Sequence, residues 1–350
     1  MIRQEQIAEA IDSQMKLFLE KKTEVIREDL PNIPIIDNFA TIITNIRRCG
    51  KSTILLQLLK QKYQNPLYFN FEDIRLAGFE VTDFSRLKNE IVRREIKVLF
   101  LDEIQLVEKW EIFVHQILNE GFAVFITGSN AKLLSKELGT HLTGRYVSME
   151  LFPFSYTEFL RYKQLTATAE SLQNYLNIGG FPEQVKNESG IILNNLLNDI
   201  LIRDIAVRHS VKALQSLRQL VVYLISNVGS LVSANKLTGM FGIKSSTILE
   251  YLNYLKDTYI VEFLPQFGYS LKAQARNPKK VYVIDTGIIS EVSSAFTDNL
   301  GHKFENLIYL HLRRSSNELY FLNKKENVIL WFSIKEKQKR RYRFAIQLIL

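Results

Sequence analysis

The sequence predicts an α/β fold, in which a parallel sheet with flanking helices is followed by a winged-helix domain and an incomplete α/β segment. Three observations predict it. A β-branched run, Thr41–Thr44, leads into a basic loop and then a helical pattern. The apolar runs Val98–Leu101 and Ala123–Thr127 are unbroken, as expected of parallel strands buried on both faces. Residues 214–285 read as three helices followed by two β-rich runs, the order of a winged helix.

Composition limits the classes of protein to consider. A chain of 350 residues is long enough for two or three domains, and 46% hydrophobic with 23% charged residues is typical of soluble globular proteins. The single cysteine, Cys49, excludes an internal disulfide and favours a reducing, cytoplasmic location. No apolar stretch is long enough to span a bilayer, so we expect no membrane partner. Much of the net charge of +8 lies in the basic tail, residues 335–343.

The loop after the first strand has the signature of a phosphate-binding P-loop, G-x-x-x-x-G-K-[ST]. Backbone N–H groups and the positive end of the following helix attract an anion in such a loop. We predict that Lys51 reaches the β/γ-phosphates of ATP and that Ser52 holds Mg²⁺. Asn45 replaces the first glycine, and asparagine tolerates left-handed backbone well. The alternative is a basic turn that opens an ordinary helix. The predicted nucleotide-binding residues are Asn45, Ile46, Arg47, Arg48, Cys49, Gly50, Lys51, Ser52 and Thr53.

Two acids follow the strand Val98–Leu101. The carboxyl end of a central parallel strand opens into the ligand crevice. We predict that Asp102 binds Mg²⁺ or its water and that Glu103 orients the attacking water. The alternative is an exposed pair of acids at a strand end.

Two further candidates lie beyond the strand Ala123–Thr127. Ser129 and Asn130 follow it, and a polar residue there, for which we favour Asn130, can contact the γ-phosphate or the water; the alternative is turn capping. Arg145 precedes another predicted strand, Val147–Leu151, and an arginine there can stabilise phosphoryl charge within one chain or across a subunit boundary. The alternative is a solvated surface arginine.

The segments NIRRCGKST, YFNFEDIR, LFLDEIQ, ITGSNAKLL, LTGRY, LFPFSYTEFL and GGFPE together resemble one prokaryotic family, the AAA-type ATPases with a C-terminal domain of unknown function. The resemblance covers nearly the whole chain and fails at its end. It implies an AAA-like P-loop domain with ATP as ligand, and Asn45 departs from the family's usual glycine. The predicted division is an ATPase domain (1–165), a helical linker or lid (166–212), a winged helix (213–290) and an incomplete endonuclease-like segment with a basic tail (291–350).

The charge of the third helix of the predicted winged helix, residues 247–257, weighs against DNA binding by this helix. Glu250 and Asp257 oppose Lys256, whereas contact with DNA phosphates needs an excess of positive charge. We therefore favour a packing or protein-docking module, with DNA binding as the alternative.

The C-terminal segment breaks the pattern that the resemblance implies. Glu305 would be the first acid of a restriction-endonuclease-like fold, but the acids expected on a following strand, which would complete a Mg²⁺ site, are absent. One hypothesis is that residues 327–350 are a frameshifted read-through. The alternative is a basic arm that binds nucleic acid.

Three functions fit these patterns. The first is a Mg²⁺-dependent ATPase whose nucleotide state moves the winged-helix half, with a homo-oligomer or a client protein as partner. The second is an ATP-gated binding or scaffold protein without hydrolysis. The third is a DNA-binding protein that acts through the winged helix.

Overall fold

The structure is a computed structural model that describes residues 1–129, 144–268, 270, 277–293, 300–324, 327–332 and 345–347. The chain divides into two compact units, Met1–Leu151 and Phe152–Leu350. The predicted division into four parts stays a prediction.

The first unit is built on a five-stranded sheet with the order β2-β3-β4-β1-β5, in which every neighbouring pair is parallel. This confirms the predicted parallel sheet with flanking helices. The elements of this unit are α1 (Gln4–Glu20), η1 (Leu30–Asn32), β1 (Ala40–Thr44), α2 (Lys51–Lys62), β2 (Pro66–Asn70), η2 (Ile74–Leu76), η3 (Val81–Asp83), α3 (Phe84–Arg93), β3 (Val98–Asp102), η4 (Ile104–Leu106), α4 (Trp110–Asn119), β4 (Ala123–Gly128) and β5 (Tyr146–Glu150).

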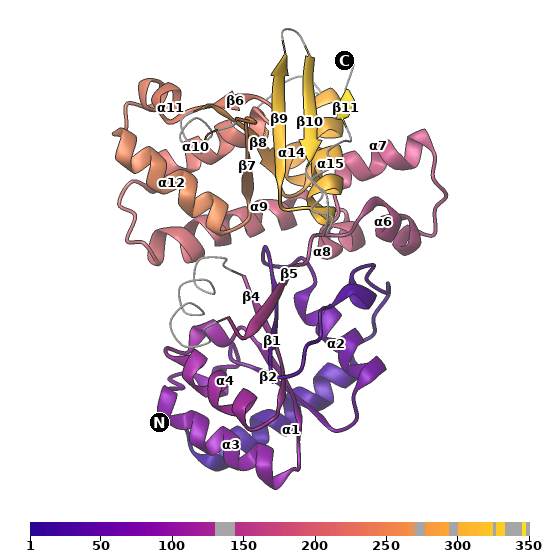
Figure 1. Cartoon of the computed structure of the whole chain (residues 1–350), viewed down its shortest axis with the longest axis vertical. Coiled ribbons are helices and arrows are strands. Elements are labelled where there is room, and N and C mark those ends of the chain that lie inside the picture. The colour runs from indigo at the N-terminus through magenta and orange to yellow at the C-terminus, as the bar shows by residue number, and fades with distance from the viewer. Residues whose placement is uncertain are drawn as a thin grey trace. The chain divides into compact units, whose positions relative to one another are not determined.

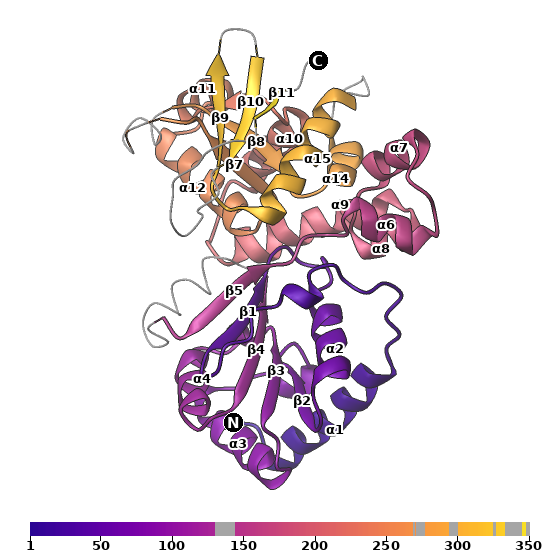
Figure 2. The same ribbon diagram turned by 45° about the vertical axis from the view of Figure 1, so that its right-hand side comes forward.

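The strand order decides which helices cover which face. The chain crosses from β1 to β2 in one direction and returns through β3 and β4 in the other. Because such crossovers are right-handed, α2 covers one face and α3 and α4 cover the opposite face. Figures 1 and 2 show α2 and α4 on opposite sides of the sheet. The carboxyl ends of β1, β3 and β4 therefore meet at one edge, where a ligand crevice forms in open α/β sheets.

Apolar side chains from both faces of the sheet form the core of the first unit. β1 is buried along its whole length, which explains its β-branched, apolar sequence. Trp110 opens α4 with no exposed surface, and the Phe113 ring one turn later stacks on Phe84 of α3 with ring centroids 4.4 Å apart. This packing holds the two helices that cover β3 and β4.

The second unit combines helices with two small sheets. One sheet has the order β6-β8-β7 and is antiparallel, and the other has the order β11-β10-β9 and is antiparallel. Its elements are α6 (Tyr156–Lys163), α7 (Ala169–Ile178), α8 (Pro182–Asn187), α9 (Gly190–Asp199), the π-helix η5 (Ile200–Val207), α10 (Leu214–Ser226), β6 (Leu231–Val232), α11 (Ala234–Phe241), α12 (Ser245–Asp257), β7 (Val261–Pro265), β8 (Lys279–Val283), α14 (Thr286–Val292), α15 (Leu300–Ser315), β9 (Leu319–Lys324), β10 (Asn327–Phe332) and β11 (Ala345–Gln347).

From α10 to β8 the elements follow the predicted order of three helices and two strands, with the short strand β6 added between the first two helices. Ser233 caps α11, because its hydroxyl accepts a hydrogen bond from the N–H of Lys236. Helix α12 begins at Ser245, with Lys244 at the capping position and no side-chain hydrogen bond from that residue to the helix. The assignment of this region as a winged helix stays a prediction.

A tight glycine junction ties the start of α14 to the end of α7. The Asp285 carboxylate accepts hydrogen bonds from the N–H of Gly180 at 2.7 Å and of Gly287 at 2.9 Å. A Cβ added at Gly180 would lie 2.2 Å from the carbonyl oxygen of Phe154, and one at Gly287 would lie 2.2 Å from that of Ile178. Glycine is therefore required for the close approach of these segments.

Candidate functional site

The loop between β1 and α2 wraps back on itself, as a P-loop does. Asn45, Arg48 and Gly50 have φ of 128°, 62° and 102°, in the left-handed region that glycine adopts most easily. Asn45 stands where the motif has its first glycine, and its side-chain Oδ1 accepts a hydrogen bond from the N–H of Ile46 at 2.6 Å. The Asn45 side chain is fully buried, and its Nδ2 has no hydrogen-bond partner among the described residues. The asparagine thus keeps the loop conformation with one buried donor unsatisfied.

Lys51, the first residue of α2, lies across this loop. Its Nζ donates to the backbone oxygens of Asn45 and Ile46, both at 2.9 Å, and the side chain is 5% exposed. The backbone N–H groups of the first turn of α2 have no partner within the helix. The ammonium group and these donors together form a positive site at the carboxyl end of β1.

Asp102, the last residue of β3, accepts hydrogen bonds from three hydroxyl groups on three elements. Ser52 of α2 donates to Oδ2 at 2.7 Å, Tyr68 of β2 donates to the same oxygen at 2.6 Å, and Thr127 of β4 donates to Oδ1. The carboxylate is 2% exposed. The structure thus brings together the two residues predicted to bind Mg²⁺, Ser52 and Asp102.

Glu103 lies beside this cluster in the left-handed conformation, with φ of 54°. Its N–H donates to the Thr127 hydroxyl at 3.3 Å, and its carboxylate accepts hydrogen bonds from Gln105 and, at 3.5 Å, from Ser129. Burial raises the pKa of the Glu103 carboxyl, while the positive charge of Lys51 acts in the opposite direction. A carboxyl with a raised pKa beside a phosphate-binding loop is suited to general-base chemistry.

The remaining residues of the predicted set differ in position. Cys49 is buried, and its backbone oxygen accepts a hydrogen bond from Arg27 at 2.9 Å. Arg47 points to the side of the loop, where its guanidinium lies 3.4 Å from the Glu72 carboxylate. Asn130 lies outside the described residues, so its sensor role stays a prediction.

Arg145 is not brought to this site. It precedes β5, and its backbone oxygen accepts a hydrogen bond from Ala40, the first residue of β1. Its guanidinium donates to the backbone oxygen of Asn38 and to the side chain of Asn119. A strand of five residues is roughly 16 Å long. Arg145 therefore lies at the amino-terminal ends of β1 and β5, and Lys51 lies at the opposite, carboxyl-terminal end of β1.

Two contributors to the site, Tyr68 and Thr127, were not among the predicted residues. Thr127 offered a signal in the sequence, as a polar residue near the end of a buried apolar strand. Tyr68 offered none, because its closeness to Asp102 depends on β2 lying next to β3.

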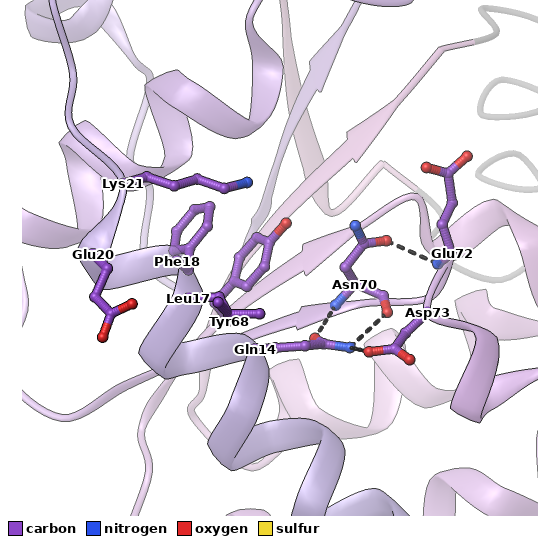
Figure 3. Close-up of a pocket in the computed structure, with 9 residues that line it drawn as sticks. All are labelled: Gln14, Leu17, Phe18, Glu20, Lys21, Tyr68, Asn70, Glu72 and Asp73. Carbon is purple, nitrogen blue, oxygen red and sulfur yellow. Dashed lines mark hydrogen bonds between the residues drawn. The ribbon is translucent and has the colours of Figure 1, made fainter.

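A cleft of about 530 Å³ opens beside this cluster, between the end of α1 and the end of β2. Figure 3 shows the rings of Phe18 and Tyr68 side by side in its wall, and shows Gln14 bonded to the backbone of Asn70 and to Asp73. The lining residues are Gln14, Leu17, Phe18, Glu20, Lys21, Tyr68, Asn70, Glu72 and Asp73.

In the second unit, Glu305 of α15 is part of a buried ion pair. Its Oε1 accepts hydrogen bonds from Lys280 Nζ and from the Tyr282 hydroxyl, both at 2.7 Å. The side chains of Lys280 and Glu305 are 6% and 8% exposed. Across the described residues, no group of three or more His, Cys, Asp or Glu is placed to hold a metal ion. The role of Glu305 as a nuclease acid stays a prediction.

Comparison with known proteins identifies the relatives of this chain. Residues 37–160 match the model of an AAA domain, and residues 169–299 match a domain of unknown function (DUF8612). The "Uncharacterized protein MJ1544" of Methanocaldococcus jannaschii is 35% identical over 95% of this chain and 80% of its own length. An "Uncharacterized protein" of Haemophilus influenzae is 30% identical over 85% of this chain and 82% of its own length.

This chain belongs to an AAA-type P-loop ATPase family. Membership implies nucleotide binding, usually with Mg²⁺, and confirms the family predicted from the motifs. Among solved structures, the Walker-type ATPase PABY2304 of Pyrococcus abyssi matches 79% of this chain and 99% of its own, with a TM-score of 0.49 and 13% identity. A likeness at this level leaves the family assignment to the AAA-domain match and the two relatives. In the part of the chain that the structure describes, no helix is long and apolar enough to cross a membrane.

Proposed function

We propose that this protein binds ATP with Mg²⁺ at the β1–α2 loop and hydrolyses it, and that the nucleotide state acts on the second unit. The observation that carries the proposal is the hydrogen bond from the Ser52 hydroxyl to the Asp102 carboxylate, with Lys51 next to Ser52 at the start of α2. A hydroxyl and a carboxylate are ligands that Mg²⁺ accepts, and proteins usually bind it through one or two carboxylates together with substrate phosphates. The donor set therefore fits the ion.

In this proposal Ser52 and Asp102 would hold Mg²⁺, which when bound neutralises charge on the triphosphate. Lys51 exchanges its bonds to the loop carbonyls for bonds to phosphate oxygens, which are stronger because both partners are charged. The N–H groups at the start of α2 bind the phosphates from the loop side. Glu103 accepts a proton from the attacking water, and its raised pKa matches that role.

The path to the second unit runs through β5. This strand pairs with β1 along its whole length, and the N–H of Leu151 donates to the backbone oxygen of Thr44 at 2.9 Å. Thr44 is the last residue before the phosphate loop, and Phe152 is the first residue of the second unit. A displacement of the loop is therefore passed from Thr44 through β5 to the boundary between the two units. We propose that this displacement moves the winged-helix region.

Arg145 enters the proposal only across a subunit boundary. At the amino edge of the sheet it is too far from Lys51 of the same chain to contact one phosphate group with it. In a homo-oligomer it can stabilise phosphoryl charge on a neighbouring copy. Mixing an Arg145→Ala chain with a Lys51→Ala chain tests this, since activity should return in the mixture and in neither variant alone.

The test of the proposed function is ATP binding and phosphate release by the full chain. Lys51→Ala should abolish both, whereas Lys62→Ala, at the far end of the same helix, should change neither. Glu103→Gln should keep ATP binding and reduce release by about 100-fold or more. Glu95→Gln is its matched control, because Glu95 is exposed and has the same φ of 54°. Release that survives Lys51→Ala would refute the proposal.

One observation favours a second candidate, an ATP-gated binding protein without hydrolysis. Asn45 puts a buried side chain with an unsatisfied Nδ2 where the family has glycine. A side chain there changes how closely the loop backbone approaches the phosphates. Tight ATP binding without phosphate release, with release gained in Asn45→Gly, would favour this candidate over the first.

A further inference from the structure

The Tyr68 hydroxyl is directed at the proposed magnesium site although nothing in the proposed chemistry requires it. It donates to Oδ2 of Asp102 at 2.6 Å, the same oxygen that accepts the hydrogen bond from Ser52. Both Tyr68 and Asp102 are buried, with exposures of 5% and 2%. The hydroxyl thus contacts the carboxylate directly, at the oxygen that it shares with Ser52, and can orient the group through this bond.

The Tyr68 ring is held in place by α1. It stacks on the Phe18 ring with centroids 3.5 Å apart and planes 7° apart, and Phe18 is 1% exposed. The N–H of Tyr68 donates to Sδ of Met15, which also belongs to α1. Figure 3 shows the stacked pair at the wall of the cleft. The orientation of the hydroxyl therefore depends on the packing of α1 against β2.

The Tyr68 hydroxyl is a donor to Asp102 in the structure. Burial, followed by the negative charge of Asp102, raises the pKa of Tyr68 well above that of a free tyrosine. Ser52 has two tasks in the proposed function, because its oxygen would face the ion while its proton bonds to Asp102. Tyr68 has one, and it stabilises the buried charge of Asp102 whether or not the ion is bound.

We propose that Tyr68 is a positioning residue for Mg²⁺, whose hydroxyl holds the Asp102 carboxylate in its metal-binding orientation and whose stacking on Phe18 makes that orientation depend on α1. The inference rests on the proposed function. Mutation of a residue that orients a metal ligand through a hydrogen bond typically lowers metal affinity by 10- to 100-fold. The effect should therefore appear in the Mg²⁺ requirement and not in the affinity for ATP without metal.

The experiment measures ATP binding by calorimetry over a series of Mg²⁺ concentrations and in excess chelator, using the full chain. Tyr68→Phe removes the hydroxyl and keeps the ring stack. Tyr63→Phe is the matched control, since Tyr63 follows α2 and packs on Phe100 and Phe125, away from Asp102. We expect the Mg²⁺ midpoint to rise by about tenfold in Tyr68→Phe alone, with metal-free ATP affinity unchanged in all three proteins.

A second variant tests the role of α1 and covers a possible folding failure of the first. Phe18→Leu keeps an apolar side chain but removes the flat stacking surface, and it should raise the Mg²⁺ midpoint in the same direction by a smaller factor. An unchanged or lower midpoint in Tyr68→Phe, or an equal shift in Tyr63→Phe, overturns the inference while leaving the proposed function intact. An unmodified chain that binds no ATP at any Mg²⁺ concentration overturns the proposed function and the inference with it.

Discussion

Asp102→Asn separates the folding role of this residue from its proposed metal role. Asparagine has nearly the same shape, and its oxygen can accept the hydrogen bonds from Ser52 and Tyr68. Its amide can donate to Thr127, whose hydroxyl is free to rotate. Three hydrogen bonds to a charged group become weaker neutral bonds, but the cost of burying a carboxylate disappears. We expect the free energy of unfolding without nucleotide to change by only about 1 kcal/mol.

The effect on nucleotide binding should be much larger. In the unmodified protein, ATP at 100 times its dissociation constant stabilises the folded state by about 2.7 kcal/mol. For a unit of this size that corresponds to a rise in melting temperature of about 5–10 °C. Asp102→Asn should lose most of the part of this rise that requires Mg²⁺, because a neutral amide oxygen attracts the ion more weakly than a charged carboxylate does.

The assay is thermal unfolding with and without ATP and Mg²⁺. Asp12→Asn is the matched control, since Asp12 lies in the same unit, pairs with Arg94 and has a side chain that is 66% exposed. The control should keep the full rise. A rise of the same size in Asp102→Asn would show that the carboxylate does not bind the ion. A loss of several kcal/mol without nucleotide would show that its hydrogen bonds cannot be remade by an amide.

The other predictions address catalysis and the second unit. Because burial raises the pKa of Glu103, its carboxyl stays protonated to a higher pH than that of a free glutamate. The rate of phosphate release should therefore increase as the pH rises through this raised pKa, and the rate of the Glu103→Gln variant should not depend on pH in this range. A pH-independent rate in the unmodified chain would contradict this prediction. Gly180→Ala should lower the free energy of unfolding of the second unit by about 3 kcal/mol or more, because the new Cβ meets a backbone oxygen at 2.2 Å. Gly239→Ala, within α11 and with open space around it, should instead raise that free energy by about 0.5–1 kcal/mol. Urea unfolding measures both variants, and equal changes in the free energy of unfolding for Gly180→Ala and Gly239→Ala would refute the reasoning. Lys280→Met should cost about 3–5 kcal/mol by leaving the buried Glu305 carboxylate without its partner, and adding Glu305→Gln should recover part of it, whereas additive losses would argue against a coupled pair.

The residues of the phosphate loop could be predicted from the sequence because the motif is local. Strand, loop and helix lie within residues 40–62, and each residue type follows from the backbone conformation or the charge needed there. Asp102 could be predicted for a similar reason, since an acid directly after a buried parallel strand must lie at the carboxyl edge of the sheet. The family resemblance extended this reading to ATP.

The order of the strands, by contrast, was decided by the tertiary structure. Tyr68 and Thr127 meet Asp102 because β2 and β4 lie on either side of β3, and a sequence of apolar runs does not state which runs become neighbours. Strand direction likewise placed Arg145 at the amino edge, away from Lys51, although its segment had suggested a phosphate contact. Local patterns determine what each segment can do, but pairing between distant segments depends on how the whole core packs, and that pairing selects which side chains share one site.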